Sequence, residues 1–305
     1  MRVFVTGATG WVGSAVTREL IDHGHEVVGL ARSERARTAL TAAGATPYRG
    51  SLDDPDGLAA AAKDADGVLH LAFDHTFTDH AGAGAADLRA IEAMGTALAD
   101  TGKPLVATSG LLFEHGHHGT EDDPGSTASP GGVRVASENA ALALAERGVR
   151  ASVLRLAASV HGAGDPGFVA RLVAVAREKG AVAVVGDGAN TWPAVHRSDA
   201  ARLYRLALES APAGTRLHGV AEEGVMLRDI ADVIARRLDV PVTHLTPRQA
   251  ADHYGWLAGF AGYGVQARSD HTRTTLDWHP TGAPLLTDLE NHYFAAPAHP
   301  GAARP

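Results

Sequence analysis

The sequence predicts an α/β fold in which a doubly wound parallel sheet is followed by a smaller C-terminal lobe. In the first half of the 305 residues, short apolar runs alternate with longer segments of helical periodicity. This alternation is typical of a parallel sheet with helices on both faces. A glycine-rich turn between the first apolar run and the first helical segment indicates a Rossmann-like arrangement.

The elements of the first half are expected in strict alternation. The strands are predicted at residues 3–6, 26–30, 67–72, 104–108 and 151–156, and the helices at 11–23, 34–43, 55–63, 85–101 and 133–147. Beyond residue 156, glycine and proline separate shorter elements, with helices expected at 167–179, 199–210 and 227–238 and strands at 181–185 and 215–220. We therefore predict a first domain over 1–156, to which later strands return, a lobe over 157–294 and a loose tail at 295–305.

Composition and charge narrow the class of protein. Hydrophobic residues make up 45% of the chain and charged residues 20%, which is ordinary for a globular protein. The net charge of −8 is spread without basic runs, so neither nucleic acid nor an anionic membrane is expected as a partner. The absence of cysteine excludes disulfides and thiolate metal sites. No leader-like segment and no membrane-length apolar run is seen, which predicts a cytoplasmic protein.

The glycine turn has the spacing of a dinucleotide-binding loop. It reads Thr6-Gly7-Ala8-Thr9-Gly10-Trp11-Val12-Gly13. Gly7 permits the tight turn, Gly10 lets the backbone approach a pyrophosphate, and Gly13 lets the helix pack close to the strand. The helix N-terminus offers unpaired N–H groups to the anion, so Thr9, Trp11 and Val12 are also predicted to contact the cofactor. The alternative is a glycine turn without a ligand.

The end of the second strand indicates which dinucleotide binds. A carboxylate there would bond the ribose 2′-hydroxyl of NAD, but this chain has Arg32 and Ser33. Arginine can pair with a 2′-phosphate and serine can hydrogen-bond it, so NADP(H) is the predicted cofactor. Arg32 as the mere start of the next helix is the alternative.

Further segments follow in an order that resembles a known family. They are His70-Leu71-Ala72, Ala107-Thr108-Ser109, Arg155-Leu156 through Val160-His161-Gly162, and Trp192 through His196 with Asp199. Together with the glycine turn, they resemble the extended and atypical short-chain dehydrogenases/reductases, the NAD-dependent epimerase/dehydratase group. The resemblance implies that Leu71 and Ala72 line the cofactor, with Leu52 at the end of the third strand near the adenine. It also implies a catalytic hydroxyl at the end of the fifth strand.

The resemblance breaks at the catalytic pair of that family, Tyr-x-x-x-Lys. The matching positions are Arg134 and Glu138, and none of the five tyrosines has a lysine four residues later. Residues four apart on a helix can pair, so an Arg134–Glu138 ion pair is the expectation for this helix.

Other residues could then perform the chemistry. Ser109 and Thr108 could hydrogen-bond the reacting group, and His161 is the leading candidate acid, with His196 second. For each histidine, packing or hydrogen bonding is the alternative role. The histidine-rich loop at residues 114–118 lacks the spacing of a metal site, so no metal is predicted and the loop is interpreted as a flexible lid.

These observations predict an NADP(H)-dependent oxidoreductase that reduces a C=O, C=N or activated C=C bond of a small organic molecule, with the C-terminal lobe binding the substrate. A non-redox isomerase, cyclase or lyase that uses the same pocket is one alternative. A catalytically silent NADP-binding regulator is the other. The helices at 85–101 and 133–147 could also pair in a homodimer.

Overall fold

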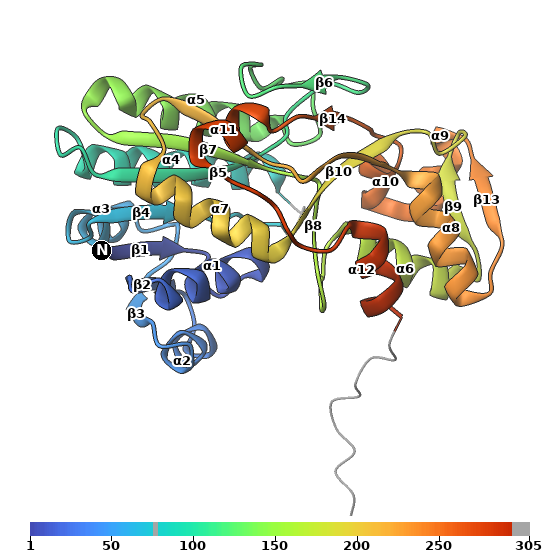
Figure 1. The fold of residues 1–305 in the computed structure, drawn as a ribbon, viewed down its shortest axis with the longest axis horizontal. Helices are drawn as coiled ribbons and strands as arrows, with labels where there is room; N and C mark the ends of the chain where they lie inside the picture. The colour runs from blue at the N-terminus through green and yellow to red at the C-terminus, as the bar shows by residue number, and fades with distance from the viewer. Residues whose placement is uncertain (76–78, 295–305) are drawn as a thin grey trace, which may run out of the picture.

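The computed structural model describes residues 1–75 and 79–294. Its main feature is a parallel sheet of seven strands in the order β11-β7-β5-β4-β1-β2-β3 (Figure 1). The strands are β1 (Arg2–Thr6), β2 (Glu26–Ala31), β3 (Thr46–Arg49), β4 (Gly67–His70), β5 (Pro104–Gly110), β7 (Arg150–Leu156) and β11 (Thr215–Gly219). The order reverses at β1 and β4, so the predicted Rossmann-like doubly wound sheet is confirmed.

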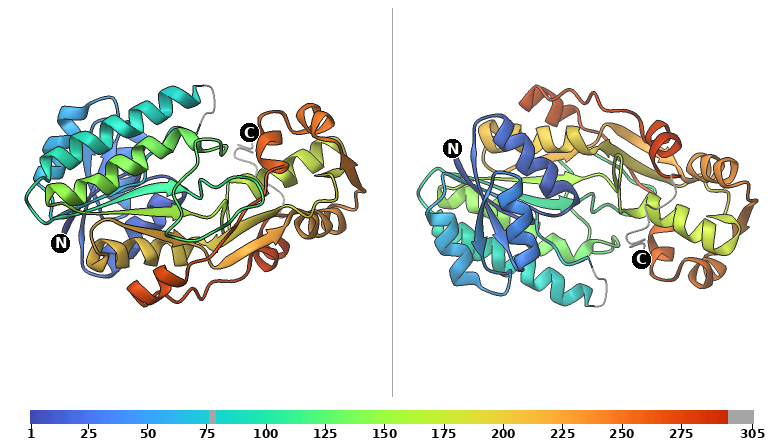
Figure 2. Two further views of the ribbon diagram at one scale, coloured as in Figure 1. Left: turned by 90° about the horizontal axis from the view of Figure 1, so that it is seen from above. Right: turned by 90° about the horizontal axis from the view of Figure 1, so that it is seen from below.

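Helices cover both faces of this sheet (Figure 2). One face carries α1 (Trp11–Asp22), α2 (Glu34–Ala42), α7 (Arg197–Ser210) and α11 (Asp270–Leu276), and the other carries α3 (Pro55–Lys63), α4 (His80–Ala97) and α5 (Val135–Ala143). Each face has its own buried apolar cluster, and the strands contribute alternate side chains to the two. The glycine turn and the ends of β4 and β5 therefore meet at the carboxyl edge of the sheet.

Several element boundaries differ from the predictions for local reasons. β4 ends at His70, because the Thr6 hydroxyl accepts the next two backbone N–H groups. α4 begins at His80 instead of residue 85, because Asp79 caps it by accepting from the Gly82 N–H at 2.8 Å. The helix expected at 133–147 is α5 flanked by two 3₁₀ turns.

The C-terminal half builds a second core beside the sheet. Its elements are α6 (Phe168–Lys179), β9 (Val182–Val185), α8 (Leu227–Leu238), β13 (Val242–Leu245), α9 (Pro247–Tyr254), α10 (Ala258–Ala261) and α12 (Leu285–His292). A three-stranded sheet of β8 (Ser159–His161), β10 (Thr191–His196) and β12 (Glu222–Met226) lies between the two parts.

The chain crosses between the two cores more than once after Leu156. α7 packs against the large sheet, and β11 joins it as an edge strand. β14 (Gln266–Ala267) pairs with β6 (His118–Gly119). The domain division at 156/157 stays a prediction, as does the homodimer. The predicted tail at 295–305 lies outside the described residues. Within the described chain, no helix combines the length and apolar character needed to cross a membrane.

Candidate cofactor and active site

The glycine turn forms a cradle that side chains would fill. Gly7 has a φ of +68°, and a Cβ there would lie 2.7 Å from the Ala72 nitrogen. A Cβ on Gly13 would lie 2.0 Å from the Gly7 carbonyl oxygen. Thr9 and Gly10 are exposed, and no side chain caps the N-terminus of α1. The turn therefore fits a dinucleotide pyrophosphate, which Thr9, Gly10 and the N–H groups of the first turn at Trp11, Val12 and Gly13 would hold.

An arginine from α7 secures this turn. The Arg197 guanidinium lies 4.0 Å from the centre of the Trp11 ring and donates to the Trp11 carbonyl oxygen at 2.6 Å. The Trp11 indole donates in turn to the Val160 carbonyl oxygen at 2.7 Å. No local sequence pattern could indicate this contact, because its partners are 186 residues apart.

Arg32 and Ser33 lie exposed at the carboxyl end of β2. Ser33 caps α2 by accepting from the Ala36 N–H at 3.2 Å. The neighbouring carboxylate, Glu34, is held by Arg37, and that hydrogen bond lowers the pKa of Glu34. A further exposed arginine, Arg49, ends β3 beside Ala31. Sequence reasoning missed Arg49, because it put the end of the third strand at Leu52, whereas β3 ends at Arg49.

The two predicted hydroxyls at the end of β5 are both buried. The Thr108 hydroxyl is 2.7 Å from the Tyr204 hydroxyl, and burial raises the pKa of Tyr204. The Ser109 side chain is 3% exposed and lies beside the Glu138 carboxylate. The hydroxyls of this strand end therefore contact the protein interior.

The predicted Arg134–Glu138 ion pair is wrong, because each residue has another partner. Arg134 donates to the Thr108 carbonyl oxygen at 2.6 Å and lies 3.4 Å from Asp87. Glu138 pairs with the fully buried Arg155 and with Arg216 at 3.2 Å. Burial acts to raise the pKa of Glu138, but the two arginines outweigh it and leave that pKa below its ordinary value.

His161 lies at the junction with the C-terminal helix. Its Nδ1 is 2.8 Å from Asp288 on α12, and its Nε2 is 3.9 Å from Glu222 on β12. His196, the second candidate, lies 3.5 Å from the same Asp288 carboxylate. Burial lowers the pKa of His161 in spite of Asp288, so the ring is neutral near pH 7. The structure brings the two histidine rings together, with their centres 5.6 Å apart.

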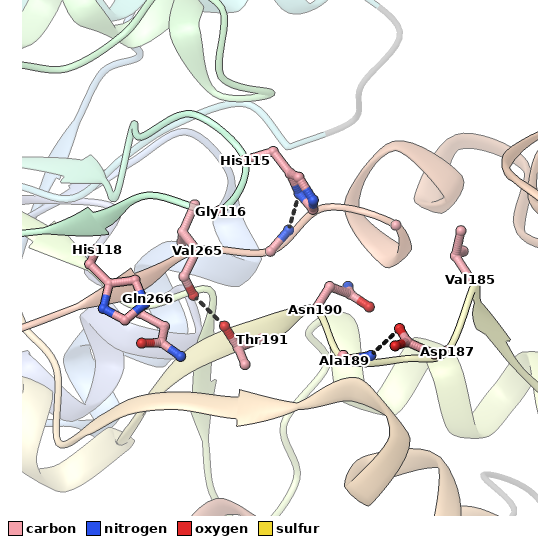
Figure 3. Close-up of a pocket in the computed structure, with 12 residues that line it drawn as sticks. His115, Gly116, His118, Val185, Asp187, Ala189, Asn190, Thr191, Val265 and Gln266 are labelled. Atoms are coloured by element: carbon pink, nitrogen blue, oxygen red, sulfur yellow. Dashed lines mark hydrogen bonds between the residues drawn. The ribbon is translucent and has the colours of Figure 1, made fainter.

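The histidine-rich loop is hydrogen-bonded to the segment that leads into β14. Its interpretation as a flexible lid stays a prediction. The Gly116 N–H donates to the Gly264 carbonyl oxygen at 2.7 Å, and the Gln266 N–H donates to the His117 carbonyl oxygen at 2.9 Å. A depression of about 410 Å³ lies beside this loop, lined by His115, His118 and Gln266 among others (Figure 3). In residues 1–75 and 79–294, no three His, Asp or Glu side chains gather in a way that could hold a metal ion.

The fold and the glycine cradle define a dinucleotide-binding α/β protein. The family model described as NAD dependent epimerase/dehydratase family matches residues 3–218. The chain belongs to this family, so the family predicted from the sequence is confirmed. Membership assigns an enzyme of the oxidoreductase type with a nicotinamide dinucleotide as its cofactor.

Three individual proteins show how far the similarity extends. An uncharacterized protein of Schizosaccharomyces pombe is 46% identical over 296 residues, which cover 96% of this chain and 100% of that protein. The 2-alkyl-3-oxoalkanoate reductase of Stenotrophomonas maltophilia is 30% identical over 239 residues, or 72% of this chain and 69% of the reductase. The solved structure of MoeE5 in complex with UDP-glucose and NAD superposes with a TM-score of 0.76 at 22% identity, covering 96% of this chain and 97% of MoeE5.

Proposed function

We propose that the protein is an NADP(H)-dependent oxidoreductase that reduces a C=O, C=N or activated C=C bond of a small organic molecule. The observation that carries the proposal is the glycine cradle next to a strand end that bears Arg32 and no free carboxylate. The similarity to a reductase of Stenotrophomonas maltophilia supports the direction of the reaction.

The charge at the end of β2 favours the phosphorylated dinucleotide. Arg32 and Arg49 stand at neighbouring strand ends, and the α2 N-terminus adds a positive dipole. Glu34 is already paired with Arg37, which limits its repulsion of a 2′-phosphate. The 2′-phosphate of NADP(H) would therefore lie near the positive charges of Arg32 and Arg49.

The chain's own residues would orient the substrate more than they would transfer protons. When bound, the nicotinamide supplies or accepts a hydride. Ser109, Thr108 and His161 stay the predicted catalytic residues. The Ser109 and Thr108 hydroxyls would hold the reacting oxygen or nitrogen, and His161 or solvent would supply the proton. An imine needs the least help, because its nitrogen can arrive already protonated.

Removing Arg32 should change the cofactor preference. We expect Arg32→Ala to weaken NADPH binding about 10- to 100-fold, because a charge-assisted contact to the 2′-phosphate is lost. NADH binding should stay within about twofold, since NADH has no phosphate there. Titration calorimetry with both nucleotides checks this. Arg89→Ala, an exposed arginine on α4, is the matched control. Equal weakening of NADH and NADPH would contradict the assignment.

The redox reaction itself is tested by a panel of carbonyl, imine and activated alkene compounds. NADPH consumption should equal product formation. We expect Ser109→Ala to lower kcat about tenfold through a lost hydrogen bond, and His161→Gln to lower kcat through the loss of a proton donor. Unchanged turnover in both variants would contradict the two assignments. Product formed without NADPH consumption would favour the non-redox alternative. Tight NADP binding without turnover of any compound would favour the regulator.

A further inference from the structure

A buried chain of hydrogen bonds joins the glycine turn to the position where the family has its tyrosine. The Thr6 hydroxyl is 2.8 Å from Nδ1 of His70, and Nε2 of His70 is 3.0 Å from Asp87. The other oxygen of Asp87 is 3.4 Å from Nε of Arg134. Thr6, His70 and Asp87 are completely buried, and Arg134 is 8% exposed. The chain therefore runs through the protein interior from β1 to α5.

The chemistry of these groups fixes the direction of each bond. The Thr6 oxygen accepts the N–H groups of Leu71 and Ala72, each at 3.1 Å, and the Leu71 N–H is shared with the Thr6 carbonyl oxygen. Because a hydroxyl has two lone pairs and one proton, its proton must point at Nδ1 of His70. That nitrogen is then unprotonated, and His70 is a neutral ring with its proton on Nε2.

The carboxylate at the centre must be ionised to accept from both sides. The Nε2–H of His70 donates to one oxygen of Asp87, and Arg134 donates to the other. Burial acts to raise the pKa of Asp87, but Arg134 and the His70 hydrogen bond outweigh it and hold that pKa below its ordinary value. Each donor in the chain thus has an acceptor.

One end of this hydrogen-bond chain supports the glycine turn, and the other end contacts Phe73 and β5. At one end, Thr6 holds Leu71 and Ala72, and Ala72 is the neighbour that a Cβ on Gly7 would meet at 2.7 Å. At the other end, the Arg134 guanidinium stacks 4.3 Å from the centre of the Phe73 ring and donates to the Thr108 carbonyl oxygen near the end of β5. A small movement of this segment would alter the wall of the glycine cradle.

We propose that Thr6, His70, Asp87 and Arg134 act as one positioning unit for the dinucleotide. Arg134 stands where the family's tyrosine handles a proton, but here it holds the Asp87 carboxylate. The carboxylate selects the Nε2–H form of His70, and His70 orients the Thr6 hydroxyl that fixes the wall of the cradle. This inference rests on the proposed dinucleotide-dependent function.

The first test is the proton position on His70 in the cofactor-free protein. Nitrogen NMR of histidine-labelled protein, with His70 assigned by the signal lost in His70→Gln, should show the neutral Nε2–H form at pH 7. Arg134→Met should lower the fraction of the Nε2–H form, because Asp87 loses one of its two donors and no longer holds the ring in a single orientation. Arg134→Lys keeps the positive charge and should retain the neutral form. An Nδ1–H form in the unmodified protein would overturn the proposal.

The second test compares two substitutions at Thr6. Thr6→Ser keeps the hydroxyl, so the His70 form should be retained and the Kd for NADPH should stay within about twofold. Thr6→Val removes one donor and two accepting positions, so the Kd should rise about tenfold. Equal Kd values for the two variants would overturn the positioning role. A protein with the expected His70 form that binds neither NADP(H) nor NAD(H) would instead refute the proposed function, while the hydrogen-bond chain itself stands.

Discussion

Gly13→Ala is expected to weaken dinucleotide binding severely. The new Cβ would lie 2.0 Å from the Gly7 carbonyl oxygen, a backbone atom that cannot rotate away. The first helix would have to move off the strand, which spreads the turn where the pyrophosphate sits. We expect the Kd for NADPH to rise about 100-fold. Titration calorimetry checks the affinity, and a thermal melt without cofactor checks the fold.

Two further glycines separate the cofactor contact from a loss of folding. Gly259→Ala is the matched control, because a Cβ there has nothing within 4 Å, and binding should be unchanged. Gly10→Ala meets a single protein atom at 3.2 Å, so it should spare the fold while it blocks the close approach of the phosphates. If Gly10→Ala and Gly13→Ala both bound NADPH like the unmodified protein, the cradle would not be the cofactor site.

Glu138→Lys, which puts a lysine at the position that the sequence resemblance assigns to the family's lysine, is expected to destabilise the protein and to give no gain in activity. Glu138 is 1% exposed on its side chain, and its partner Arg155 is 0% exposed. Removing one partner of a buried ion pair costs about 3–5 kcal/mol, and the new ammonium would also face Arg216. We expect the thermal midpoint to fall by about 10 °C, measured by calorimetry.

The control for this change is Glu146→Lys, which reverses the same charge at an exposed position just after α5. It should shift the midpoint by no more than about 1 °C. Glu138→Gln keeps a hydrogen-bond acceptor for Arg155 and should fall between the two. If Glu138→Lys had the same thermal midpoint as the unmodified protein and reduced substrates faster, position 138 would still serve catalysis.

The fold was largely predictable because its signals are local. Five apolar runs and the spacing of Gly7, Gly10 and Gly13 were enough for the sheet and the cradle. The bounds of the third strand were not predictable, because the four residues of β3 include Pro47, which is tolerated only because the strand lies at the sheet edge. Whether a strand lies at the edge of a sheet depends on the tertiary structure, so it cannot be predicted from the neighbouring residues alone.

The candidate site was less predictable, because its side chains pair with residues that are distant in the sequence. Arg134 and Glu138 are four residues apart, which favoured their pairing, but Asp87 and Arg155 compete from other elements and are more deeply buried. Asp87 is 47 residues from Arg134, so no local pattern could indicate it. Thr108 was predicted as a substrate contact, but Tyr204 from α7 lies within hydrogen-bond distance of its hydroxyl.

The repeated crossings of the chain after Leu156 have a practical consequence for anyone who wishes to divide this protein. A fragment that stops at the predicted domain boundary would lack α7, whose Leu203 and Tyr204 are completely buried in the core shared with the sheet. It would also lose β11 and leave β7 as an open edge with unpaired backbone groups. The nucleotide-binding half is therefore completed by residues encoded far downstream, and the unit of expression, truncation or grafting is the whole chain.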